Sequence, residues 1–136
     1  MRQNRMRRLA VALWLVVVSL ILVPGLVLGH AELVTPTPPD KSVATEPVAE
    51  ISGIYSDSMK TDGSSLVVKD AGGAQVATGG VDPANDKRMM ATPDAPLGNG
   101  TYTVESTTLA LDGDIAHATW TFTVAIAATP APSAVA

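Results

Sequence analysis

The sequence predicts an all-β fold, an immunoglobulin-like antiparallel sandwich of seven strands that follows an N-terminal signal segment. Two observations predict this class. Short runs rich in Val, Thr, Ile and Tyr are separated by turn residues about every ten positions, which is typical of the strands of a sandwich. After residue 30, no stretch keeps helical periodicity for three turns. With 136 residues in the chain, we expect one domain, over residues 30–125.

The first predicted strands surround a rigid turn. An edge strand near residues 33–34 precedes the proline-rich turn at 36–40. Residues 49–56 alternate, so that Ile51 and Tyr55 fall on one face and the polar residues on the other. This alternation predicts a strand with one buried face.

The middle of the chain predicts a hairpin and a long strand. Residues 65–69 and 75–77 are β-prone and flank the Asp-Ala-Gly-Gly turn at 70–73. The Gly-Asn-Gly turn at 98–100 precedes residues 101–109, which are rich in Thr, Val and Tyr. In the last strand, Trp120, Phe122 and Val124 share one face, and we expect them in the core.

Residues 1–29 read as a signal peptide. Four of the nine basic residues lie within the first eight positions, and an apolar run over 9–23 follows them. The expected cleavage lies before His30, and a cut after Ala31 also fits the small-residue rule. Because the run approaches the roughly 20 residues of a membrane span, an uncleaved anchor is the alternative. All three readings place the domain outside the cytoplasm, in the periplasm or on the extracellular face of the envelope.

Composition excludes several classes of function. The chain has no cysteine, so disulfide frameworks and thiolate metal sites are excluded. After residue 29 it carries five basic and thirteen acidic groups, a net charge of −8, which argues against nucleic-acid binding. With two histidines and none of the common catalytic motifs, no enzymatic activity is expected. Residues 126–136, rich in Ala and Pro, read as a flexible tail.

Four stretches, in their order and spacing, resemble the CopC family of exported copper-resistance domains. His-Ala-Glu-Leu at 30–33 resembles that family's start, a histidine directly after the signal. Residues 50–57 (EISGIYSD) resemble its alternating strand ending in Phe-Ser-Glu, and 97–104 (LGNGTYTV) its Leu-x-x-Gly-Thr-Tyr-Thr-Val. Asp112-Gly113 followed by residues 119–124 resembles its Asp-Gly-His segment and last strand. The resemblance covers residues 30–124.

The resemblance implies a copper site. In the family, a mature N-terminal histidine binds Cu(II) through its imidazole and α-amine, together with the Asp and His of Asp-Gly-His; here His30 and Asp112 match. The third residue is Asp114 in place of the histidine. A carboxylate is a harder ligand than imidazole, so we expect weaker Cu(II) binding. The resemblance also implies delivery of copper to a partner, for which a membrane copper transporter is the candidate.

Other residues offer alternatives at this site. His117 has the parity of Thr119 and Thr121, so we expect it to face solvent, and only a bend in the loop would make it a ligand. Three methionines, Met59, Met89 and Met90, suggest thioether binding of Cu(I) or simple core packing.

The sequence hypothesis is therefore an exported Cu(II) carrier or buffer. The alternative is a metal-free immunoglobulin-like structural or interaction module of the cell envelope, which the Asp-Gly-Asp replacement favours.

Overall fold

The computed structural model describes residues 3–8, 11 and 29–129. The predicted signal peptide, 1–29, and the end of the predicted tail, 130–136, therefore lie mostly outside the described residues. Residues 3–8 are helical, and all regular structure within 29–129 is β. None of the helices in the described part of the chain is long and apolar enough to cross a membrane.

Eight strands form the domain. They are β1 (Leu33–Thr37), β2 (Ser42–Ala44), β3 (Ile51–Tyr55), β4 (Ser65–Lys69), β5 (Gln75–Asp82), β6 (Asn85–Ala91), β7 (Gly100–Leu109) and β8 (Ile115–Val124).

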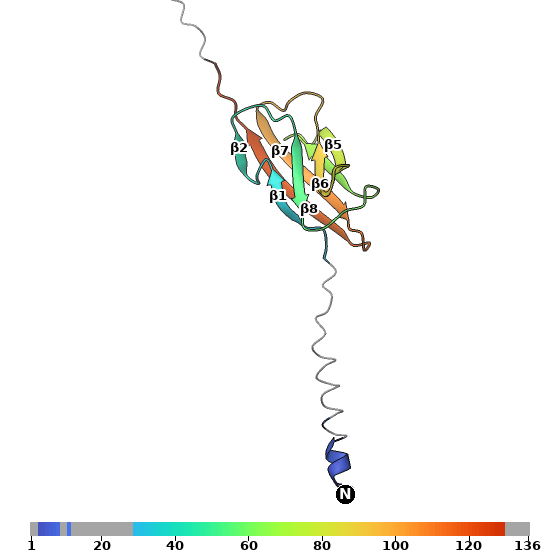
Figure 1. Ribbon diagram of the computed structural model, residues 1–136. Coiled ribbons are helices and arrows are strands. Elements are labelled where there is room, and N and C mark those ends of the chain that lie inside the picture. Colours follow the sequence, from blue (N-terminus) through green and yellow to red (C-terminus); the bar gives the residue numbers. More distant parts are fainter. Residues whose placement is uncertain (1–2, 9–10, 12–28, 130–136) are drawn as a thin grey trace, which may run out of the picture.

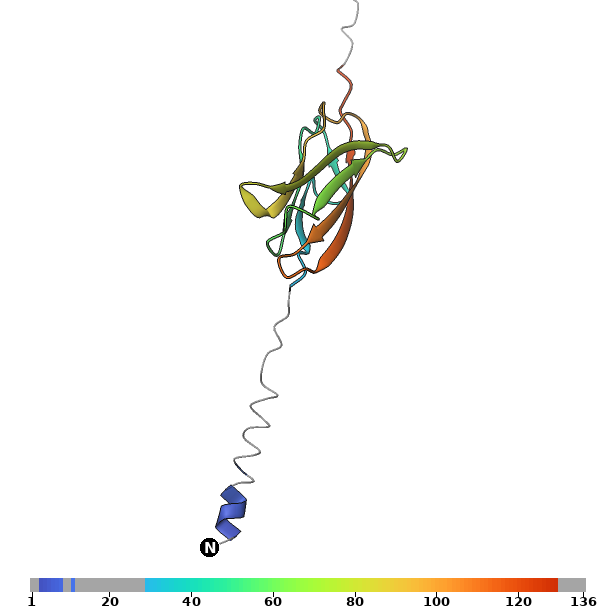
Figure 2. The same cartoon turned by 90° about the vertical axis from the view of Figure 1, so that its right-hand side faces the viewer.

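The strands make one hydrogen-bonded sheet that folds over on itself into two layers (Figure 1). Its strand order is β1-β3-β6-β5-β4-β7-β8-β2, so β1 and β2 are the two edges. β5 joins the layers, because its first half pairs with β4 and its second half, from Gly79 on, pairs with β6. In Figure 2 this strand crosses from one layer to the other. The transfer requires glycine at Gly79, where a Cβ would lie 1.8 Å from the carbonyl oxygen of Met90.

The predicted all-β, immunoglobulin-like class is confirmed, with two differences in detail. There are eight strands and not seven, and the short β2 pairs in parallel with β8 while every other pair is antiparallel. Two strands were not predicted from the sequence, the short β2 and β6; the first four residues of β6 are Asn-Asp-Lys-Arg. Its Arg88 is stabilised by Asp82 of β5 and by Glu50, so a polar segment is held in the sheet by ion pairs.

The core lies between the layers and follows the predicted alternation, except that Ser52 of β3, predicted to lie on the exposed face, is also buried. Trp120, Phe122 and Val124 of β8 are buried, as are Ile51 and Tyr55 of β3. All five were predicted to point inward.

One tyrosine of β7 joins the core to a turn, as in other immunoglobulin-like sandwiches. The Tyr102 ring stacks on Phe122 with 5.4 Å between ring centroids. Its hydroxyl donates to the carbonyl of Gly98 at 2.8 Å, which anchors the turn before β7.

The side chains of the interior change toward the end of the sandwich where the blue-cyan segment that leads into β1 enters (Figure 1). On β8, the inward positions that follow the line of Trp120 are Ala116 and Ala118, both only half-buried. On β7, the matching inward positions are the buried Ser106 and Thr108. Small and polar side chains therefore line this end, whereas large apolar ones fill the rest.

Candidate metal centre

The start of the domain is fastened to this polar end by two hydroxyl groups. Ser56, just after β3, donates to the carbonyl of His30 at 2.9 Å and accepts the N–H of Glu32 at 3.0 Å. From the opposite layer, Thr108 donates to the carbonyl of Ala31 at 3.0 Å. Ala31 and Thr108 are 2% and 1% exposed, so this bond is buried. Residues 30–32 thus belong to the packed domain.

The loop between β7 and β8 meets the domain start at the same end. Within the loop, the N–H of Ala110 donates to the carbonyl of Asp114 at 2.8 Å, and Gly113 adopts φ +100°. The side chain of Asp112 accepts the N–H of Asp114 at 3.0 Å, which is an Asx turn. Asp112 therefore stabilises the turn, and Asp114 lies at the end of the turn.

The structure brings His30 and Asp114 together. The Nδ1 atom of His30 lies 3.3 Å from Oδ2 of Asp114, and the two side chains are 56% and 44% exposed. An imidazole nitrogen and a carboxylate oxygen are both ligands that divalent transition metals accept. Half-exposed, the pair can exchange a bound ion with solvent or with another molecule.

A third acidic group, Asp57, lies beside the residue that precedes His30. A Cβ on Gly29 would lie only 2.4 Å from Oδ2 of Asp57, so this carboxylate is in contact with the backbone there. Ser56 connects it to the same network, with its Oγ 3.4 Å from Oδ2 of Asp57. Asp57 was not among the candidate ligands predicted from the sequence. The sequence feature that could have identified Asp57 is its position at the end of Tyr-Ser-Asp, the stretch that resembles the family's Phe-Ser-Glu.

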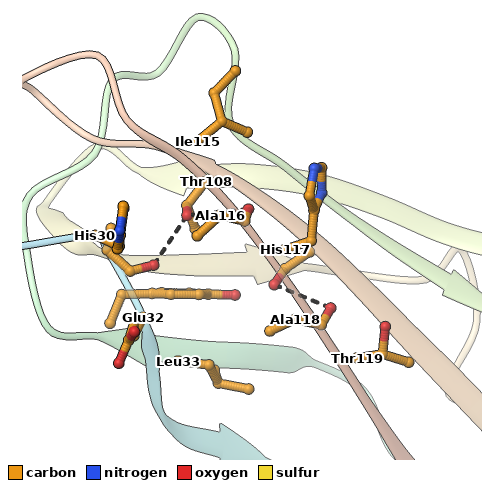
Figure 3. Close-up of a pocket in the computed structure, with 12 residues that line it drawn as sticks. His30, Glu32, Leu33, Thr108, Ile115, Ala116, His117, Ala118 and Thr119 are labelled. Carbon is orange, nitrogen blue, oxygen red and sulfur yellow. Dashed lines mark hydrogen bonds between the residues drawn. The ribbon is translucent and has the colours of Figure 1, made fainter.

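His117 faces outward, in agreement with the parity argument. Its side chain is exposed, and its Nδ1 lies 3.1 Å from Oγ1 of Thr107 on β7. Figure 3 shows that the rings of His30 and His117 do not point toward each other. The loop between β7 and β8 does not bring His117 into the His30–Asp114 pair.

The three methionines do not form a surface cluster. Met59 and Met89 are buried in the core. Met90 is half-buried, with its sulfur 3.4 Å from a guanidinium nitrogen of Arg88. This arrangement corresponds to core packing, one of the two interpretations that the sequence left open.

Across residues 3–8, 11 and 29–129, no three His, Asp or Glu side chains are close enough together to hold a metal ion. The arrangement is therefore a ligand pair, His30 and Asp114, with Asp57 and Asp112 at the same end of the fold. Completing a coordination sphere requires further donors, from the backbone, from a new chain terminus or from a second molecule.

Comparison with known proteins gives a consistent picture. The family model described as the CopC domain matches residues 33–125. CopC from Methylosinus trichosporium OB3b has a similar fold, with a TM-score of 0.67 and 21% identity, over 74% of this chain and 98% of that chain. PcoC, described as a methionine-rich copper resistance protein from Escherichia coli, has a TM-score of 0.59 and 25% identity, over 71% of this chain and 100% of that chain. No curated protein sequence matches the chain.

Proposed function

The chain belongs to the CopC family, and from this premise we propose that it is an exported copper-resistance protein that binds Cu(II) reversibly and carries or buffers it outside the cytoplasm. The observation that carries the proposal is the pair formed by His30 and Asp114, 3.3 Å apart at the start of the domain. In this proposal the protein is a carrier or buffer with no turnover of its own.

Cleavage before His30 would complete the donor set. It would create an α-amino group at residue 30, so one residue would offer two nitrogens, and Cu(II) favours tetragonal sets of nitrogen and oxygen donors. The new amine would form where Asp57 already contacts the backbone, which places a second carboxylate beside it. The burial of Ala31 and its bond to Thr108 favour this cut over one after Ala31, which would remove both.

The donor set determines the expected affinity for Cu(II) and its pH dependence. Because carboxylate is harder than imidazole, the site should hold Cu(II) less tightly than one in which histidine stands at this position. Cu(II) must displace protons from an imidazole and from an α-amine, whose pKa is ordinarily about 8, so binding should weaken as the pH falls.

Titration of the exported, mass-verified protein with Cu(II) tests the proposal. We expect His30→Ala to lower the affinity by at least about tenfold, since it removes a primary ligand. Asp114→Ala should weaken binding, and Asp112→Ala should weaken it less, because Asp112 acts through the turn. His117→Ala is the matched control and should bind as the parent does.

Paramagnetic resonance of the bound Cu(II) distinguishes this proposal from a metal-free interaction module. Two or more nitrogen donors are expected. A spectrum with oxygen donors only, or equal losses from His30→Ala and His117→Ala, would contradict the proposal and favour the module.

A further inference from the structure

One edge of the sheet is open beside the domain start. β2 pairs with β8 only over Phe122, Thr123 and Val124. In the part of the chain that the structure describes, no strand pairs with the same side of β8 over residues 115–121. The first half of β8 is therefore an edge, although β8 is an inner strand at its other end.

The hydrogen bonds around β2 show which backbone groups point to this edge. The N–H of Thr121 donates to Oδ1 of Asp40 at 3.0 Å, and its carbonyl accepts the N–H of Lys41 at 2.6 Å. Both groups of Thr121 therefore point away from β7. Because the direction alternates along a strand, the N–H and C=O groups of the other odd-numbered residues also face outward. Along the open half these are Ile115, His117 and Thr119.

This open edge lacks the features that protect edges in other proteins. Natural edge strands are commonly blunted by proline, lysine or a bulge. β1, the other edge, has two of these, Pro36 and a register shift between Leu33 and Thr35. Residues 115–119 read Ile-Ala-His-Ala-Thr, with no proline or lysine, and they pair with β7 in unbroken register.

A groove of about 510 Å³ runs along the open edge, between residues 30–33 on one side and 115–119 on the other (Figure 3). It exists because Ala116 and Ala118 are too small to fill the interior there. Tyr55, a residue only 2% exposed, also lines the groove.

We propose that the groove binds an extended, cationic peptide segment of a partner protein, which adds to the open half of β8 as an antiparallel strand. The backbone of the segment would pair with Ile115, His117 and Thr119, and its inward side chains would fill the space over the two alanines. The acidic groups Glu32 and Asp114 lie near one end of the groove, which favours a basic residue at that end of the segment. At the other end, Asp40 is followed by the basic Lys41. Residues 30–33 bound the groove on its other side, so a single strand fits there and a second folded domain does not.

The probe for this proposal is the peptide acetyl-Lys-Val-Thr-Val-Lys-amide. With its central threonine opposite His117, both valines point inward and the N–H groups of the threonine and lysines face β8. We expect saturable NMR shifts at the amides of Ile115, His117 and Thr119. N-methylation of the central threonine should weaken binding by about tenfold or more, whereas N-methylation of either valine should change it by less than about threefold, because those groups face away from β8.

Two variants at one position supply the matched control. Thr119→Pro removes an outward N–H that takes no part in pairing with β7, so the fold should persist while peptide binding is lost. Thr119→Val keeps the N–H and should bind as the parent does. No shifts at millimolar peptide, equal effects of N-methylation at threonine and valine, or normal binding by Thr119→Pro would each overturn the proposal. Shifts at these amides that depend on protein concentration without peptide would also overturn it, since a second copy would then occupy the edge.

Discussion

Replacing Thr108 by valine should loosen the start of the domain while leaving the sandwich intact. Valine keeps the shape and β propensity of threonine, so the change removes essentially one hydroxyl. That hydroxyl donates to the carbonyl of Ala31 at 3.0 Å, and both residues are almost fully buried. A buried carbonyl without its partner costs about 1–3 kcal/mol. We therefore expect the free energy of unfolding, measured in urea, to fall by about 1–3 kcal/mol.

Hydrogen exchange shows whether the loss is local. The N–H of Ser56 donates to the carbonyl of Glu32 at 2.9 Å, so this amide should exchange faster in Thr108→Val than in the parent. Amides in the middle of β7 and β8 should still exchange only through global unfolding. Thr103→Val on the same strand is the control, because its partly exposed side chain is not bonded to Ala31; we expect a change within about 0.5 kcal/mol. Equal stability losses in the two variants would refute the reasoning.

The remaining predictions concern the sheet. Gly79→Val should destabilise the domain by more than about 3 kcal/mol, because the added Cβ would lie 1.8 Å from a backbone carbonyl oxygen. Gly98→Ala is the control and should be nearly neutral, because no atom lies within 4 Å of the added Cβ. Thermal unfolding measures the stability of both variants. The N–H of Ala84 and then the guanidinium of Arg88 lower the pKa of Asp82, so this carboxylate stabilises the fold above its unfolded pKa of about 3.9 and loses that effect as the pH falls further. Asp82→Asn should be less stable than the parent at pH 7, and the difference should shrink below about pH 4; a difference independent of pH would refute this ion-pair role.

Part of the fold was predictable because alternation is a local property. Whether Trp120 or Thr121 faces the core depends only on the two-residue period of a strand, and the sequence shows that period directly. The same rule correctly predicted that the side chain of His117 faces solvent. It could not predict β6, whose polar residues are held by Arg88 pairing with groups from two other segments.

The sequence by itself determined the class of fold, the family and the inward face of its longest strands, because each follows from short runs of neighbouring residues. Only the tertiary structure decided that Asp114, and not Asp112, faces His30. The side chain of Asp112 instead stabilises the turn that leads to Asp114. It also decided that Asp57 lies beside Gly29 and that half of β8 is left unpaired. These features depend on how segments distant in sequence meet in space, which no local pattern encodes.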